Sequence, residues 1–174
     1  MFDPTIFENL KVALENIVYD LDNLDQRVLV TGRTDIQDMA VMSRKFTLRF
    51  ELVPATGVAA EICLEAYLKD LAAEILELPG ENPGCSLSLR FYMNLHGGPS
   101  VCERIQKVMD IIWEPEVPPV QTLSYVHGES SNRLSNRIEL KFPRKINEHN
   151  MTELPSLTLH IIRTLEELSA LSEA

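Results

Sequence analysis

The stretch that decides the fold covers residues 45–52 and reads KFTLRFEL. Its apolar side chains, Phe46, Leu48, Phe50 and Leu52, alternate with polar ones, which is the period of a β-strand with one buried and one solvated face. Helices are therefore expected to cover one side of the sheet that contains this strand, and the other side is expected to stay open.

The spacing of apolar residues also predicts further strands and four helices. Strands are expected at residues 27–31, 45–52, 87–94, 120–127 and 133–142. Apolar residues at helical spacing predict a helix after Asp3-Pro4, one from Thr56-Gly57 to Pro79-Gly80, one capped by Ser100, and one with a stripe from Leu154 to Leu168. The predicted class is α+β. It is a two-layer sandwich of about five antiparallel-rich strands with four helices mostly on one face, in the order α-β-β-α-β-α-β-β-α.

Two distant segments resemble each other. Residues 42–50, MSRKFTLRF, match residues 134–142, LSNRIELKF, while Gly32 and Gly128 precede them as expected hairpin-turn residues. These matches predict duplication of an α-β-β-α unit. One domain over 1–174 would then comprise a first half at 1–80, a connecting strand at 81–96 and a second half at 97–174. Amphipathic strands also resemble one another without duplication, and that alternative stays open.

The composition is that of an ordinary globular protein and excludes some partners. The chain has 174 residues, 45% of them hydrophobic, and a formal net charge of −10. This charge opposes a phosphate backbone and argues against nucleic acid as a partner. The three cysteines have no CxxC spacing, which favours thiols in a reducing compartment. The sequence shows no signal-peptide pattern and no bilayer-length apolar run, so we expect a cytoplasmic protein without a membrane partner.

No cofactor, metal site or catalytic residue is predicted. Residues 26–35, QRVLVTGRTD, suggest a dinucleotide-binding turn, but no second glycine follows Gly32 at the GxGxxG spacing. The histidines and cysteines lack the spacing of metal ligands. Without a complete catalytic constellation, the sequence favours a protein that is not an enzyme.

One loop offers an alternative. His96, Gly97, Gly98 and Ser100 belong to a strand-glycine-helix arrangement, which can present backbone N–H groups to an anion or oxyanion. A small hydrolase or anion-binding protein could be built on this loop. The GxSxG elbow of α/β-hydrolases is missing, however, and the glycines are equally explained by a turn that Ser100 follows as helix cap.

The preferred hypothesis concerns the polar faces of the strands. On the side away from the helices, the charged side chains of the strands at 45–52, 87–94 and 133–142 are mostly basic, whereas the acidic residues lie mainly on the helices. The candidate binding residues are Arg49, Arg90, Tyr92, Arg137 and Lys141. The function expected from them is that of a non-catalytic adaptor or chaperone-like module that binds a protein partner, such as an acidic segment. Self-association, a structural role in a larger assembly, and a face whose basic side chains only keep it solvated are the alternatives.

Overall fold

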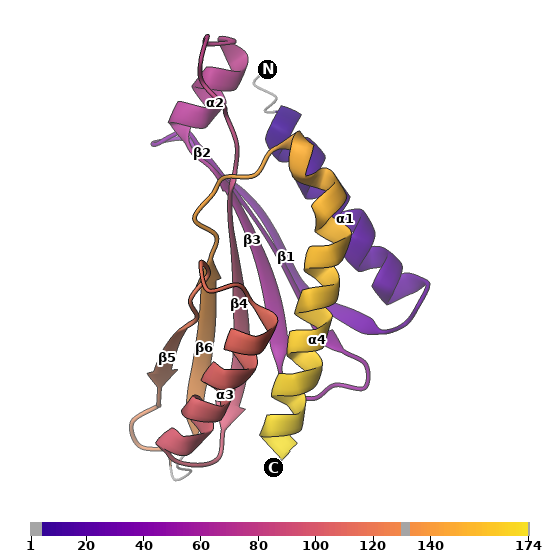
Figure 1. Ribbon diagram of the computed structural model, residues 1–174, viewed down its shortest axis with the longest axis vertical. Helices are drawn as coiled ribbons and strands as arrows, with labels where there is room; N and C mark the ends of the chain where they lie inside the picture. Colours follow the sequence, from indigo (N-terminus) through magenta and orange to yellow (C-terminus); the bar gives the residue numbers. More distant parts are fainter. Residues whose placement is uncertain (1–4, 130–132, 174) are drawn as a thin grey trace.

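The computed structural model describes residues 5–129 and 133–173 and shows an α+β fold (Figure 1). Six antiparallel strands form one sheet in the order β1-β2-β3-β4-β6-β5. The sequence had predicted about five. The elements are α1 (Thr5–Asn23), β1 (Val28–Asp38), β2 (Ser43–Leu52), β3 (Ala59–Ala66), α2 (Leu68–Ile75), β4 (Ser86–Leu95), α3 (Pro99–Ile112), β5 (Val120–Ser124), β6 (Leu134–Lys141), the 3₁₀ helix η1 (Glu148–Glu153) and α4 (Leu154–Glu173). The predicted start at Asp3-Pro4 lies outside the described residues.

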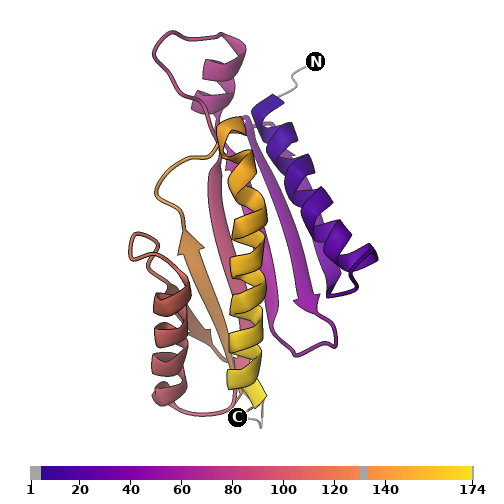
Figure 2. The same cartoon turned by 45° about the vertical axis from the view of Figure 1, so that its right-hand side comes forward.

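Three helices cover one side of the sheet. Figures 1 and 2 show α1, α3 and α4 on the same side, while α2 lies beyond the ends of the strands. Helix α1 buries Phe7, Leu10, Leu14 and Val18, whose spacing places them on one helix face. A single cluster of buried side chains joins these helices to β2, β3, β4 and β6. None of the helices in the described part of the chain is long and apolar enough to cross a bilayer.

The predicted helix from Thr56-Gly57 to Pro79-Gly80 is wrong. Its first part is strand β3, which pairs with both β2 and β4, and only Leu68–Ile75 is helical. Leu64 and Leu68 fit a helical stripe, but Ala60, Ile62 and Leu64 also share one face at a period of two. Paired with Phe50, Leu48 and Phe46 of β2, they are buried in the core. Pairing with strands on both sides outweighs the local helical preference.

Gly32 is not a hairpin-turn residue. It lies inside β1 at a shift of register between Val30 and Gly32, and the chain turns only after Asp38. Gly128, in contrast, lies between β5 and β6 with φ of 90°. The extra residue of the bulge changes which side chains face the helices. Arg33 and Asp35 consequently point toward α1.

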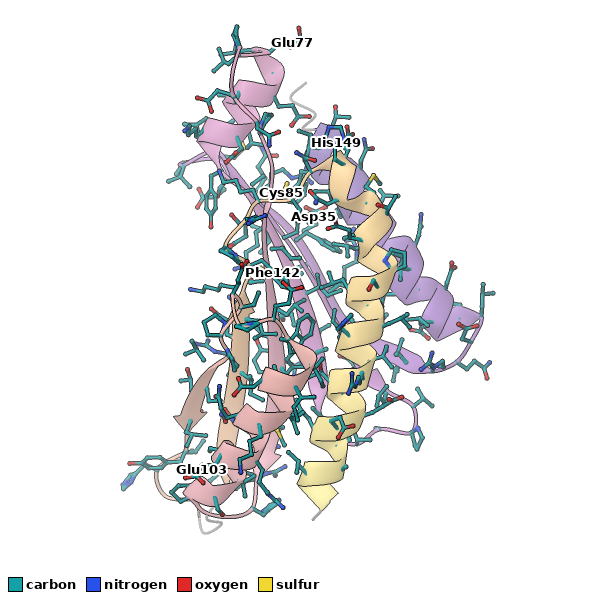
Figure 3. All side chains as sticks on the ribbon, viewed as in Figure 1. Asp35, Glu77, Cys85, Glu103, Phe142 and His149 are labelled. Carbon is teal, nitrogen blue, oxygen red and sulfur yellow. The ribbon has the colours of Figure 1, made fainter. Side chains whose placement is uncertain are left out.

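The bulge supplies the polar contacts that hold α1 on the sheet. Arg33 forms an ion pair with Glu15, and Lys11 lies 2.8 Å from Asp35. Arg44 of β2 donates to the same Asp35 at 2.9 Å and stacks over Phe7 at 4.7 Å. Asp35 is labelled in Figure 3, between the sheet and the helices. These contacts link α1 to both strands of the first hairpin.

The duplication hypothesis loses some of its matches and keeps others. The similar segments 42–50 and 134–142 lie mainly in β2 and β6, each of which is the second strand of an outer hairpin. The second and fourth predicted helices, which duplication would make equivalent, differ in position: α2 lies at the end of the sheet and α4 over its face. The equivalence of Gly32 and Gly128 also fails. Duplication therefore stays a prediction only for the two units that consist of a helix and the hairpin after it, α1-β1-β2 and α3-β5-β6. The division of the chain into two halves also stays a prediction.

Candidate functional site

The side of the sheet opposite α1, α3 and α4 carries two neighbouring rows of side chains; we call this side the open face. The first row follows the cross-strand register through Arg49, Glu61, Arg90 and Glu139, on β2, β3, β4 and β6. Residues in direct register lie on the same face of a sheet, close enough for side chains to interact. Positive and negative charges therefore alternate across four strands. We call these four residues the ion-pair row.

Arg90 is the centre of the ion-pair row. Its Nε donates to Glu139 at 2.9 Å and its guanidinium lies 3.3 Å from Glu61. Burial alone would lower the pKa of Arg90, but its hydrogen bond with Glu139 and the nearby acidic groups raise it. Burial alone would raise the pKa of Glu139, but Arg90 and Lys141 hold it below its ordinary value. These charges are engaged with one another and are poorly placed to receive a partner.

The second row contains Glu51, Ala59, Tyr92, Arg137 and Thr122, again in direct register from β2 to β5. An open hollow of about 520 Å³ lies along it. Ala59 also lines the hollow, and its methyl group is buried between longer neighbouring side chains. The polar side chains that line the hollow include Asn94, Thr122, Ser124 and Ser135.

Two guanidinium groups line this hollow. Arg49 belongs to the ion-pair row by register, but its guanidinium lies over the Tyr92 ring, 4.4 Å from the centroid. Arg137 is directly opposite Tyr92 on the neighbouring strand. Among residues 5–129 and 133–173, neither arginine has an acidic group within salt-bridge distance. Both retain donors for an incoming anionic group.

The structure thus separates the five predicted binding residues. It brings Arg49, Tyr92 and Arg137 together at the hollow. Arg90 is held between two glutamates, and Lys141 lies 3.3 Å from Glu139 with its side chain pointing largely into solvent.

The expectation of a basic face omitted strand β3. Glu61 and Glu65 of β3 lie on the open face, where Glu65 is 3.2 Å from Lys45 and Glu61 pairs with Arg90. The Tyr92 hydroxyl also donates to Glu61 at 3.1 Å. The face is consequently a mixed and mostly paired surface. The missed signal was the alternation of AAEICLEA, whose glutamates share one face.

The predicted anion-binding loop of His96, Gly97, Gly98 and Ser100 lines two hollows that share Gly97. Gly98 is the N-cap of α3 and Pro99 its first residue, so Ser100 lies inside the helix and the predicted Ser100 cap is wrong. His96, Gly97 and Ser100 line one hollow, whereas Gly97, Gly98 and His127 line the other. In the described part of the chain, no hydrogen bond joins a serine to a histidine side chain at this loop.

Other reactive side chains are dispersed. No three His, Cys, Asp or Glu residues that could hold a metal ion come together in the described ranges. Figure 3 shows His149 near the start of α4 and Glu103 on α3, at opposite ends of the molecule. Cys63 and Cys85 are buried as free thiols, and burial raises the pKa of Cys85 to about 12. Both are therefore expected to remain protonated.

Comparisons of this chain with protein-family models, with curated proteins and with solved structures found no match.

Proposed function

We propose that this chain is a non-catalytic protein-binding module, adaptor-like or chaperone-like, which docks an acidic segment of its partner on the open face. The observation that carries the proposal is the hollow in which Arg49 and Arg137 flank Tyr92 without an acidic partner among the described residues. Arginine forms paired hydrogen bonds with carboxylates, and an aromatic ring beneath a guanidinium fixes its orientation.

The surroundings of the hollow support binding to an extended segment. Helices α1, α3 and α4 all lie on the other side of the six-stranded sheet (Figures 1 and 2), and Glu61, Arg90 and Glu139 of the ion-pair row are already paired with one another. A second shallow hollow beside β5 shares Thr122 and Arg137 with the first and adds the apolar side chains of Pro118 and Val120. Placement in the cytoplasm belongs to this proposal, and the three free cysteines support it.

The test is the binding of a fluorescent peptide with several aspartates to the full chain, measured by anisotropy. Arg49→Gln and Arg137→Gln should each weaken binding about three- to fivefold, because a solvent-exposed ion pair contributes up to about 1 kcal/mol. Arg163→Gln is the matched control, because Arg163 is exposed on α4, on the helix side. Equal affinities for all three variants would overturn the proposal.

The same samples address an assembly subunit as the alternative function. A mass measurement in solution without peptide should give a monomer if the open face exists to receive another protein. A defined oligomer that does not bind the peptide, and that dissociates when Arg49 and Arg137 are replaced, would assign the face to self-association instead.

A further inference from the structure

We propose that the hollow selects an extended segment in which an acidic side chain lies four positions from a basic one. The acidic group would lie between Arg49 and Arg137, and the basic group over Glu51. This inference rests on the proposed function and specifies the chemistry of the partner.

The two ends of the hollow carry charges of opposite sign. Arg137 and the guanidinium of Arg49 lie on the side of β4 and β6, whereas Glu51 lies on β2 and lines the same hollow. No lysine or arginine of the described ranges lies within salt-bridge distance of Glu51. The hollow is therefore positive toward β6 and negative toward β2.

The distance between these two ends matches the spacing of residues four apart in an extended segment. Glu51 and Arg137 are in register but separated by three strand spacings, or about 14 Å. Residues four apart in an extended segment point to the same side and are about 13 Å apart. A segment that crosses the strands would therefore place two such side chains over the two ends. Its middle residue would lie over the middle of the hollow, which Ala59 and Tyr92 line.

The charges of the hollow also discriminate between segments that differ in the sign and spacing of their charged residues. A segment with acidic groups at both positions would bring one of them against Glu51, and like charges in contact oppose binding. A segment with a spacing of three would direct its second charged side chain away from the sheet. Charge complementarity therefore favours a partner with both signs of charge over a uniformly acidic one.

The experiment uses the full chain and short fluorescent peptides of Gly, Ser and Thr with two charged residues. One set carries Asp and Lys at a spacing of four, in both orders because a segment can cross the strands in either direction. The others carry Asp and Lys at a spacing of three, Asp and Gln at four, and two Asp at four. Anisotropy should show the Asp-Lys pair at a spacing of four binding about three- to fivefold more tightly than the rest in at least one order.

Variants then separate this inference from the proposed function. Glu51→Gln should remove the preference for Asp-Lys over Asp-Gln, and Glu51→Lys should reverse it in favour of two Asp. Glu103→Gln, an exposed glutamate on α3, is the matched control and should change nothing. If the peptides bind through Arg49 and Arg137 but Glu51→Lys leaves their ranking unchanged, the inference is overturned and the proposed function stands. If no peptide binds, or if binding ignores Arg49 and Arg137, both fail.

Discussion

Replacing Arg90 by methionine should destabilise the protein, because it leaves two partly buried glutamates without their shared cation. The Arg90 side chain is 22% exposed, and those of Glu61 and Glu139 are 15% and 14% exposed. Exposed ion pairs contribute about 0–1 kcal/mol, and breaking a fully buried one costs about 3–5 kcal/mol. Because these three side chains are partly buried, we expect the free energy of unfolding to fall by about 2 kcal/mol. For a chain of this length, that loss corresponds to a fall in Tm of about 4–8 °C.

Urea unfolding measures this loss, and the fluorescence of Trp113 reports it because the chain contains one tryptophan. Trp113 is buried and donates to Thr164 at 3.1 Å on the helix side, so its signal should follow the loss of the core. Lys141→Met is the matched control. Lys141 also pairs with Glu139, but its side chain is 79% exposed, and the expected change is within about 0.5 kcal/mol.

The pH dependence of the free energy of unfolding tests whether the loss of stability comes from the ion pairs of Arg90. Arg90 and Lys141 hold the pKa of Glu139 below its ordinary value despite burial, so the folded state binds this proton less readily than the unfolded state. The associated stabilisation is complete above the unfolded pKa of about 4.3 and is lost as pH falls through the lower folded value. The difference between wild type and Arg90→Met should therefore be full near pH 7 and narrow below about pH 4. A difference under about 0.5 kcal/mol at neutral pH, or one that does not narrow in acid, would refute this reasoning.

Three further predictions concern the rest of the fold. Asp35→Asn should cost roughly 1–3 kcal/mol of stability in urea unfolding, because Asp35 accepts from both Lys11 and Arg44; an unchanged midpoint would contradict the role given to the β1 bulge. Gly84→Ala should lower Tm, because its Cβ would lie 2.8 Å from the Ile146 carbonyl oxygen, whereas Gly32→Ala, whose Cβ would make an ordinary contact 3.6 Å from the Arg49 Cβ, should lower it much less. In the native protein Cys102 should react with a thiol reagent well before Cys63 and Cys85, which are buried; mass spectrometry of the labelled protein would show the opposite order if this were wrong.

Much of the open face could be predicted from alternation alone. The polar positions of residues 45–52, 87–94 and 133–142 lie on one side of the sheet because side chains alternate in any β-strand. Three of the five candidate binding residues meet at the hollow for this reason. That Arg49 reaches over Tyr92 could not be predicted, because it depends on which strands become neighbours.

The errors have a common physical origin in long-range pairing. Residues 59–66 have both helical and strand periodicity, and only the presence of β2 on one side and β4 on the other makes them a strand. The shift of register at Gly32 likewise reflects pairing with β2, and α1 supplies the charges that Arg33 and Asp35 meet. Neither of these pairings is specified by the local sequence.

The amino-acid sequence by itself determined the α+β class and the helix-covered side of the strands. These follow from periodicity, which local chemistry imposes on each element. Tertiary structure alone decided that β3 adds glutamates to the open face and that Arg90 is paired, whereas Arg49 and Arg137 meet no acidic group among the described residues. The reason is that a side chain's partners are set by the order and register of strands, and these come from contacts between residues far apart in the chain.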